Sequence, residues 1–402
     1  MRNLDSTRQT ILVLVLLAAF GVGAAEDKTK DAADPARYWS FEKLSKTPRF
    51  RPCPFPESRY PGMRALMVEG VGPEDSPAEF FAYYAVPDGK GPKGGWPGVL
   101  LVHGGGGTAF PNYVEDWKKL GFAVLTFDYF NQRPAPGLTN VPPCEVTVPR
   151  VDLKGGYRKH HLSNVANAVV AHSLLRSFPE VNPNRTVFVG LSWGSWYGTC
   201  LAALDGRFKG GVEIYCGDRN PLSGSSELVD GRFLPVTKVP LRWTVGTNDQ
   251  NASPYTQNDG FAACGKLAGL TIVNKLPHSH AGFIFDSVQR NALHFVGLGK
   301  GLPVLGEAVV FGGKVRAPIL DPGAGISHAK LGYTCATDSA TWKRPWKYAP
   351  AKVVGRFVVA DIPDGTVQCY LAAFEGDARY HDLCGTTKYV TLVETTHDRI
   401  VR

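Results

Sequence analysis

Short apolar runs alternate with helical stretches through the first three quarters of this 402-residue chain. The runs hold few polar residues, as is typical of strands buried on both faces of a parallel sheet. They lie at residues 65–68, 78–86, 97–102, 123–127, 187–189, 211–215, 240–246 and 270–276. Residues 161–178 and 196–204 are predicted as helices. The alternation predicts an α/β fold, with two antiparallel strands leading into a mostly parallel sheet flanked by helices.

The pattern changes after about residue 312. Strand-like runs then follow one another with turns between them and no helical stretch, at 329–334, 351–360, 366–374 and 388–393. This arrangement predicts a small C-terminal all-β sandwich. Its aromatic residues Trp342, Trp346 and Tyr348 are candidates for binding a glycan, but packing inside the sandwich or at a domain interface is the favoured explanation. The expected division is a leader at 1–25, an α/β domain at 26–312 and a sandwich at 313–402.

The run at 187–189 leads directly into the pentapeptide Gly190–Gly194, which reads Gly-Leu-Ser-Trp-Gly. Gly-x-Ser-x-Gly between a strand and a helix is the pattern of a nucleophile elbow, a strained turn that exposes the serine hydroxyl. The flanking glycines let neighbouring backbone pass without meeting a Cβ atom. The pattern alone is a weak signal, but its position between a predicted strand and a predicted helix makes Ser192 the candidate nucleophile.

A second motif follows the predicted strand at 97–102. His103 is succeeded by four glycines, residues 104–107, whose backbone is free to turn its N–H groups toward a ligand. Acyl transfer places negative charge on a former carbonyl oxygen, and fixed N–H donors stabilise that charge. We assign the donors to Trp193 and to Gly105 or Gly106. A phosphate loop is not supported, because no Lys-Ser or Lys-Thr pair follows the glycines and Gly-x-Gly-x-x-Gly is not matched.

A serine nucleophile in this setting needs an acid and then a histidine later in the chain. Asp249 stands in the polar turn after the run at 240–246, and active sites of open α/β sheets lie at such strand ends. It would orient the imidazole and stabilise its charged form. Asp218 is the second candidate. Asp128 precedes the serine and is ranked last.

Two histidines compete for the role of general base, His278 and His280, both following the last predicted strand. We favour His280, because the small residues after it leave room for a loop that presents the ring. His103 is assigned to the glycine loop. A neutral imidazole is needed to accept the serine proton, so activity should fall below a pH of about 6 to 7. The remaining histidines before the elbow are expected at the surface or in packing: His160, His161 and His172.

The segments 103–110, 190–194, 204–209, 245–249 and 277–280 together resemble the acetyl xylan esterase and dienelactone hydrolase branch of the α/β-hydrolases. The resemblance covers roughly residues 60 to 300. It implies an α/β-hydrolase fold and serine esterase chemistry on small acyl groups, often acetyl esters of plant polysaccharides. By match of motif, Ser192, Asp249 and His280 take the triad roles.

The chain departs from that branch at two points. Dienelactone hydrolases use a cysteine nucleophile, whereas the serine here favours an ordinary ester. Related esterases often carry a glycine directly after the Trp-Gly of the elbow, where this chain has Ser195, which is expected to narrow the pocket.

The first 25 residues read as a signal peptide, with Arg2 and Arg8 ahead of the apolar run 11–20 and small residues before Glu26. The run is too short for an ordinary transmembrane helix, although an uncleaved anchor is the alternative. A secreted or periplasmic protein without stable membrane insertion is therefore expected. The formal net charge is +8, which could favour polyanionic glycans, but no dense basic run with interleaved aromatics indicates nucleic-acid binding.

Eight cysteines in an exported chain permit disulfides. A pair among Cys335, Cys369 and Cys384 is plausible, whereas Cys200 and Cys216 resemble buried thiols. The spacing shows no Cys-x-x-Cys, no His-Glu-x-x-His and no calcium loop, so neither a metal nor another cofactor is predicted.

The sequence thus predicts a two-domain serine esterase acting on an acylated carbohydrate or another small ester. A prolyl-oligopeptidase-like peptidase is ranked low, because the stretch before the catalytic sheet is too short for that family's propeller. A non-catalytic glycan-binding protein on a hydrolase scaffold is the alternative of another class. The sequence leaves the oligomeric state open.

Overall fold

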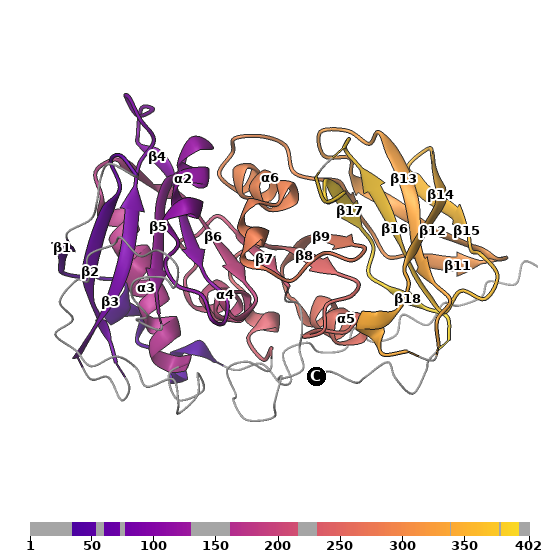
Figure 1. Cartoon of the computed structure of the whole chain (residues 1–402), viewed down its shortest axis with the longest axis horizontal. Coiled ribbons are helices and arrows are strands. Elements are labelled where there is room, and N and C mark those ends of the chain that lie inside the picture. Colours follow the sequence, from indigo (N-terminus) through magenta and orange to yellow (C-terminus); the bar gives the residue numbers. More distant parts are fainter. Residues whose placement is uncertain are drawn as a thin grey trace, which may run out of the picture.

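The computed structural model describes residues 34–53, 60–72, 77–129, 161–215, 231–337, 339–377 and 379–393. Figure 1 shows two sheets side by side along the long axis, the first with helices packed on it and the second without. The expected leader, His160, Asp218 and Cys216 lie outside the described residues. Among the described residues, no helix has both the length and the apolar character needed to cross a bilayer.

The first sheet has nine strands in the order β1-β2-β3-β5-β4-β6-β7-β8-β9. Strands β1, β2, β3 and β5 pair antiparallel, and every pairing from β5 through β4 to β9 is parallel. The predicted α/β sheet is confirmed. Its strands are β1 (Phe50–Cys53), β2 (Arg64–Val71), β3 (Pro77–Ala85), β4 (Trp96–Val102), β5 (Ala123–Asp128), β6 (Val181–Leu191), β7 (Gly211–Ile214), β8 (Leu241–Gly246) and β9 (Leu267–Val273).

Helices cover both faces of this sheet (Figure 1). Alternate residues of one strand face opposite sides, so Leu100 and Leu101 of β4 belong to different apolar cores. Helices α3 (His161–Ser177), α4 (Trp193–Leu204) and α5 (Pro254–Ala263) pack into the first core, and α2 (Pro111–Lys119) and α6 (Asp286–Phe295) into the second. Short helical turns complete the set: η1 (Pro35–Arg37), α1 (Phe41–Leu44), η5 (Leu234–Val236), η6 (His280–Ile284) and η7 (Thr341–Lys343).

The order of the strands along the chain reverses direction at β4. After β4 the chain passes through α2 to β5 on one side, and then crosses back through α3 to β6 on the other side of β4. In open α/β sheets this reversal leaves a crevice at the carboxyl ends of the adjoining strands, where ligands bind. The carboxyl ends of β4 and β6 carry the glycine loop and Ser192.

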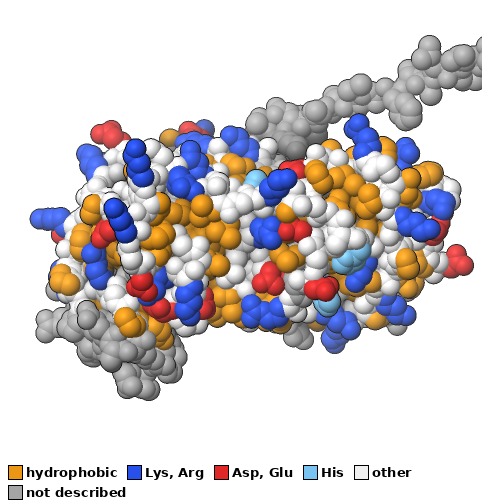
Figure 2. All heavy atoms as spheres, turned by 90° about the horizontal axis from the view of Figure 1, so that it is seen from above, with side chains coloured by type: hydrophobic (Ala, Val, Ile, Leu, Met, Phe, Trp, Pro, Cys, Tyr) orange, Lys and Arg blue, Asp and Glu red, His pale blue; other side chains and the backbone are white. Residues whose placement is uncertain are grey.

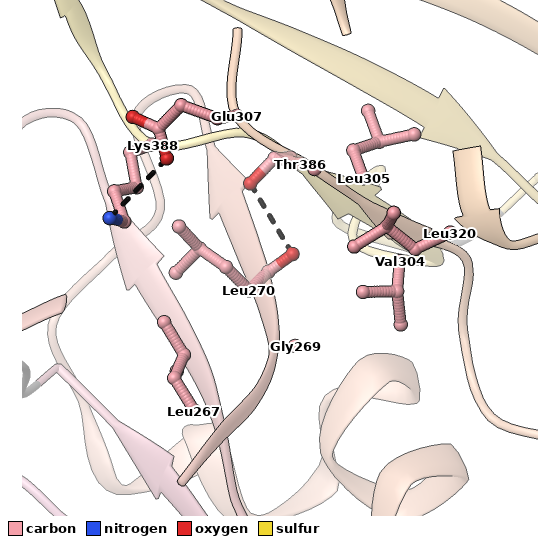
Figure 3. A pocket seen from close by; sticks show the side chains of 10 residues that line it. Leu267, Gly269, Leu270, Val304, Leu305, Glu307, Leu320, Thr386 and Lys388 are labelled. Carbon is pink, nitrogen blue, oxygen red and sulfur yellow. Dashed lines mark hydrogen bonds and ion pairs between the residues drawn. The ribbon is translucent and has the colours of Figure 1, made fainter. Parts of the chain in front are cut away.

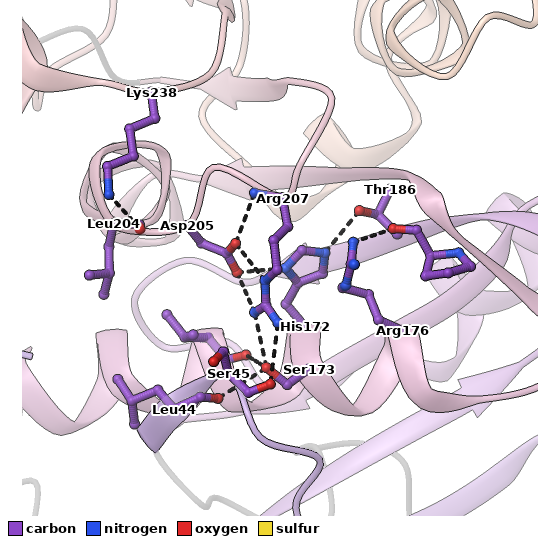
Figure 4. Close-up of polar contacts among 12 residues, drawn as sticks. Leu44, Ser45, His172, Ser173, Arg176, Thr186, Leu204, Asp205, Arg207 and Lys238 are labelled. Carbon is purple, nitrogen blue, oxygen red and sulfur yellow. Dashed lines mark hydrogen bonds and ion pairs between the residues drawn. The ribbon is translucent and has the colours of Figure 1, made fainter. Parts of the chain in front are cut away.

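A buried polar network ties α3 to the sheet beneath it (Figure 4). The Nδ1 atom of His172 lies 2.7 Å from Asp205 Oδ2, and its Nε2 atom lies 2.9 Å from Thr186 Oγ1. Arg207 donates to the same carboxylate. Burial lowers the pKa of His172 to about 4, so the ring is neutral at physiological pH. The sequence analysis expected His172 at the surface or in packing. It is fully buried, and both ring nitrogens are hydrogen-bonded, so it has a packing role.

The second sheet is antiparallel, in the order β10-β12-β15-β14-β13-β16-β17, with β11 paired to β12 and β18 to β16. It curls so that both halves contribute to one small apolar core, for example Val315 and Val358 from one half and Leu331 and Leu371 from the other. The predicted sandwich is confirmed in this form. Its strands are β10 (Val304–Leu305), β11 (Val309–Phe311), β12 (Lys314–Asp321), β13 (His328–Thr334), β14 (Lys347–Val354), β15 (Phe357–Asp361), β16 (Gln368–Phe374), β17 (Cys384–Thr386) and β18 (Val390–Thr391).

Two details of the second sheet differ from the sequence prediction. The single strand expected at 351–360 is wrong: the chain reverses at Gly355, whose φ is +58°, and forms the hairpin β14–β15. Strands β10 and β11 already pair with β12, so the second sheet begins before residue 313. The aromatic residue Trp346 is buried against Tyr370 and Tyr389, which supports its packing role.

The second sheet covers the edge of the first along β9. Thr271 Oγ1 donates to the carbonyl oxygen of Cys384 at 2.6 Å, and Ile272 N donates to Thr386 Oγ1 at 3.2 Å. A cavity of about 260 Å³ opens at this seam, lined mainly by leucine and valine side chains and bordered by the Glu307–Lys388 ion pair (Figure 3). Covering β9 removes an edge that would otherwise be open to pairing with another chain.

The expectation that the cysteines form disulfides holds for some of them and not for others. Cys53 is disulfide-bonded, which suits an oxidising compartment. Cys335, Cys369 and Cys384 are free thiols, so the pair considered among them is wrong. On the face shown in Figure 2, lysine and arginine side chains are dispersed among acidic ones and form no single basic patch.

Candidate active site

Ser192 stands at the junction of β6 and α4 with φ 56° and ψ −117°. A non-glycine residue with positive φ is uncommon, and the strained turn lifts the side chain out of the sheet. A Cβ atom built on Gly190 would lie 2.4 Å from Gly194 O, and one built on Gly194 would lie 2.1 Å from Val102 O. Both glycines are therefore required by backbone packing, as the elbow pattern predicts.

The structure joins three of the predicted residues by hydrogen bonds, with one correction. The Nε2 atom of His278 lies 3.1 Å from Ser192 Oγ, and its Nδ1 atom lies 2.9 Å from Asp249 Oδ2. His278, and not the favoured His280, lies between the serine and the carboxylate. The geometry suits the tautomer in which Nδ1–H donates to Asp249 and Nε2 accepts from the serine hydroxyl.

Asp249 is held in place by the turn that ends β8. Its side chain is almost fully buried, and Oδ1 accepts a hydrogen bond from the backbone N–H of Asn251 at 2.9 Å. A hydrogen bond from Lys275 N to Thr247 Oγ1, at 3.2 Å, joins this turn to the segment that leads to His278. The two loops that present acid and base are thus fixed to each other.

His280 faces the glycine loop. It is the first residue of η6, two positions beyond His278, and its ring lies 4.9 Å from that of Phe110. A Cβ atom built on Gly107 would meet His280 Nε2 at 2.5 Å and His103 Nδ1 at 2.9 Å. Burial, with smaller contributions from His103 and His278, lowers the pKa of His280 to about 4, so this ring is uncharged above that pH.

The glycine loop is anchored by His103 and Asp128. The ring of His103 stacks on Tyr129 with centroids 3.9 Å apart, and its Nδ1 lies 2.7 Å from Gly104 O. Asp128, ranked last as catalytic acid, accepts a hydrogen bond from Thr108 at 2.8 Å. Asp128 therefore serves the loop and not the triad, and His103 belongs to the loop as expected.

The loop passes directly over the elbow. A Cβ atom built on Gly104 would lie 3.2 Å from Ser192 Cβ, and one built on Gly105 would lie 2.7 Å from the Trp193 ring. Gly106 has φ +69°, a conformation that favours glycine. Trp193 is the first residue of α4, where backbone N–H groups point out of the helix. Of the candidate oxyanion donors, Trp193 directly follows the serine and Gly105 lies against the Trp193 ring, while Gly106 is the next residue of the same loop.

Ser195 is expected from the sequence to narrow the pocket, but its side chain points elsewhere. Its side chain is fully buried, and Oγ lies 2.9 Å from Gly190 O and 2.8 Å from Ile214 O. Ile214 N also donates to this oxygen at 3.0 Å. The hydroxyl therefore points into the core and ties α4 to β6 and β7.

The sequence prediction missed two residues beside the triad. Tyr215, directly after β7, stacks on the His278 ring, and Asn248 donates to the carbonyl oxygens of Trp342 and Arg344, between β13 and β14. The strand-end positions of both residues were the only available signal. Within the described part of the chain, no group of three or more His, Cys, Asp or Glu side chains could hold a metal ion.

Comparison with known proteins gives similarity of structure at low sequence identity. No family model matches the chain, and no curated protein matches it in sequence. Among solved structures, an acetyl xylan esterase from Paenibacillus sp. R4 matches 62% of this chain and 90% of its own, with 17% identity and a TM-score of 0.47. Acetyl xylan esterase 1 from Thermoanaerobacterium sp. JW/SL YS485 matches 66% and 93%, with 14% identity and a TM-score of 0.46. A putative dienelactone hydrolase from Klebsiella pneumoniae subsp. pneumoniae MGH 78578 matches 58% and 98%, with 14% identity and a TM-score of 0.41.

Proposed function

We propose that this protein is a secreted serine esterase that hydrolyses small acyl esters, with acetyl groups on a polysaccharide such as xylan as the expected substrate. The single observation that carries the proposal is the position of His278, hydrogen-bonded to Ser192 on one side and to Asp249 on the other. A nucleophile, a base and an orienting acid in these relations can perform acyl transfer.

In the proposed reaction the hydroxyl of Ser192 attacks the ester carbonyl while His278 Nε2 takes its proton. Asp249 accepts the Nδ1–H bond and stabilises the imidazolium that forms. The backbone N–H groups of Trp193 and of Gly105 or Gly106 stabilise the oxyanion. His278 then gives the proton to the leaving alcohol, and an acyl-enzyme remains.

Hydrolysis of the acyl-enzyme repeats the sequence with water as the nucleophile. His278 removes a proton from water, the oxyanion forms in the same position, and Ser192 regains its proton as the acid leaves. The site is therefore expected to need a neutral imidazole and to lose activity below a pH of about 6 to 7.

The acetyl and polysaccharide specificity rests on the resemblance noted in the sequence and on the kind of solved structure that the chain is similar to. The signal-peptide pattern and the disulfide at Cys53 support export. The peptidase alternative and the glycan-binding alternative have no specific observation in their favour.

The test is acetate release from acetylated xylan by the mature protein, beside turnover of 4-nitrophenyl acetate and butyrate, with Ser192→Ala as the matched control. Loss of the nucleophile should lower kcat by several orders of magnitude. Release from xylan that disappears in the variant supports mechanism and substrate class together. Turnover of the small esters alone discards the polysaccharide, and no turnover of any ester contradicts the proposal.

A further inference from the structure

The imidazole of His278 is covered on one face by an aromatic ring that the proposed mechanism does not use. The ring of Tyr215 stacks on it with centroids 4.3 Å apart and planes at 21°. The hydroxyl of the same tyrosine donates to the carbonyl oxygen of Pro277, the residue directly before His278. Tyr215 therefore contacts both the histidine ring and the backbone that carries it.

Tyr215 is itself firmly held. Its backbone has φ +61°, a left-handed conformation that L-residues seldom adopt, and its N–H donates to Thr244 O of β8 at 3.0 Å. Phe285 packs edge-on to the ring, with centroids 6.2 Å apart and planes at 89°. Burial raises the pKa of Tyr215, so the phenol stays neutral and keeps its donor proton.

We propose that Tyr215 is a positioning residue that fixes the plane of His278 and stabilises, through its ring face, the imidazolium formed during proton transfer. The face of an aromatic ring carries negative electrostatic potential and attracts a cation within about 6 Å of its centroid. A stack at 4.3 Å lies within this range. The catalytic part of the inference rests on the proposed function, because acyl transfer is the step that forms this imidazolium during turnover.

The proton balance of the step is simple. The proton leaves Ser192 Oγ for His278 Nε2, and the ring then carries one positive charge without any change of redox state. The titratable groups near the ring are Asp249 at Nδ1, from the turn after β8, Tyr215 on its flat side, from the end of β7, and His280 on the same segment. Two neutral groups also contact the ring nitrogens: Asn251 Nδ2 lies 3.3 Å from Nδ1, and Ser192 Oγ lies 3.1 Å from Nε2. Asp249 and Tyr215 favour the imidazolium, whereas a charged His280 would oppose it.

The two contacts of Tyr215 can be separated by a pair of variants. Tyr215→Phe keeps the stack and removes the hydrogen bonds of the phenol with Pro277 and Ser279, and Tyr215→Leu removes the stack as well. For Tyr215→Leu we expect the acid limb of the kcat/KM profile to move down by about half to one pH unit and kcat to fall roughly tenfold, with KM within about twofold. Tyr215→Phe should keep the wild-type acid limb. An unmoved limb in Tyr215→Leu, or an equal shift in both variants, overturns the ring-face role.

A closer control changes the electrostatics of the ring at nearly constant shape. Phenylalanine is compared with a ring-trifluorinated phenylalanine at position 215, whose face is less negative, and the pH at which the His278 ring signal shifts is followed by NMR. The signal is assigned by its loss in His278→Asn. We expect the midpoint to fall in the fluorinated protein, and equal midpoints overturn the inference.

This measurement separates the inference from the proposed function. The NMR midpoint does not depend on turnover, so a fluorine-dependent shift in a protein without ester turnover contradicts the esterase and leaves the ring contact standing. Active enzyme with equal midpoints in both proteins contradicts the role of Tyr215 and leaves the esterase standing.

Discussion

Gly194 has no room for one more carbon atom. A Cβ atom there would lie 2.1 Å from the carbonyl oxygen of Val102, which is backbone and cannot rotate away. Gly194→Ala should therefore destabilise the protein by about 3 kcal/mol or more, or prevent folding. The measurement is the urea midpoint of the purified variant.

Gly206→Ala is the matched control. Gly206 is exposed, and the nearest atom to a Cβ built there is Lys238 Cδ at 3.6 Å, which is ordinary contact. We expect its midpoint to stay close to wild type. Equal midpoints for the two variants would show that the close approach at the elbow does not exist.

At this scale the sequence predicted Ser192 and Asp249, because an elbow pattern and a strand-end carboxylate have local signatures. It favoured His280 over His278, whereas the structure places His278 between Ser192 and Asp249. The choice depends on how the chain turns after β9, where Lys275 has φ +57° and η6 begins at His280. The argument for His280 was that small residues leave room for a loop, and it took no account of this backbone path.

At the scale of elements, the segment between β13 and β14 supports the loop that carries the candidate acid. The side chain of Asn248 donates to Trp342 O at 2.8 Å and to Arg344 O at 2.9 Å, and its Oδ1 accepts from Thr247. Asn248→Asp places a carboxylate against two carbonyl oxygens and should displace the neighbouring Asp249. We expect kcat for 4-nitrophenyl acetate to fall by between about tenfold and a hundredfold.

Asn258→Ala tests whether such an effect is specific to the acid loop. Asn258, on α5, also joins the two halves of the fold, through paired hydrogen bonds with the backbone of Tyr389, between β17 and β18, at 2.8 and 3.0 Å. The Asn258→Ala variant should have a lower melting temperature than wild type without a comparable change in kcat. A loss of kcat of the same size in both variants would assign the effect to general loosening of the interface.

The elements themselves were predictable where the pattern was long and regular. Strands β2 to β9 overlap the eight apolar runs, and α3 and α4 match the two predicted helices within a few residues. Strand β1 and helices α2, α5 and α6 were not predicted, and β6 begins six residues before its apolar run. The second sheet was harder to predict from the sequence, because β10, β11 and β17 have two or three residues each and are too short to show a periodic pattern. The reversal at Gly355 was hidden inside a continuous run of strand-forming residues.

At the scale of the whole molecule, stability should pass through a maximum near pH 6. Burial lowers the pKa of His172 and of His280 to about 4, below the ordinary value of 6.5. Between these values the unfolded chain binds protons that the folded chain does not, so stability falls as the pH drops from about 6.5 to 4. The check is the urea midpoint measured across this range.

The alkaline side of the maximum comes from Glu213, a fully buried carboxyl group on β7 that accepts hydrogen bonds from Trp243 and Thr199. Burial raises its pKa from 4.5 to about 8. The unfolded chain therefore loses this proton first, and the contribution of Glu213 to stability falls as the pH rises from about 4.5 to 8. Glu213→Gln keeps the shape and has no charge to bury, so above the maximum, from about pH 6 to 8, its stability should decline less than that of wild type. An identical decline would contradict this assignment.

The central claim is that Ser192 is a nucleophile activated by His278. The most direct measurement is the rate at which a fluorophosphonate probe labels the protein, with the modified peptide identified by mass spectrometry. We compare wild type with Ser192→Ala, His278→Asn and His280→Asn. The account predicts labelling at Ser192 in wild type and in His280→Asn, none at this site in Ser192→Ala, and a rate reduced by orders of magnitude in His278→Asn. Rapid labelling of His278→Asn together with slow labelling of His280→Asn would contradict it.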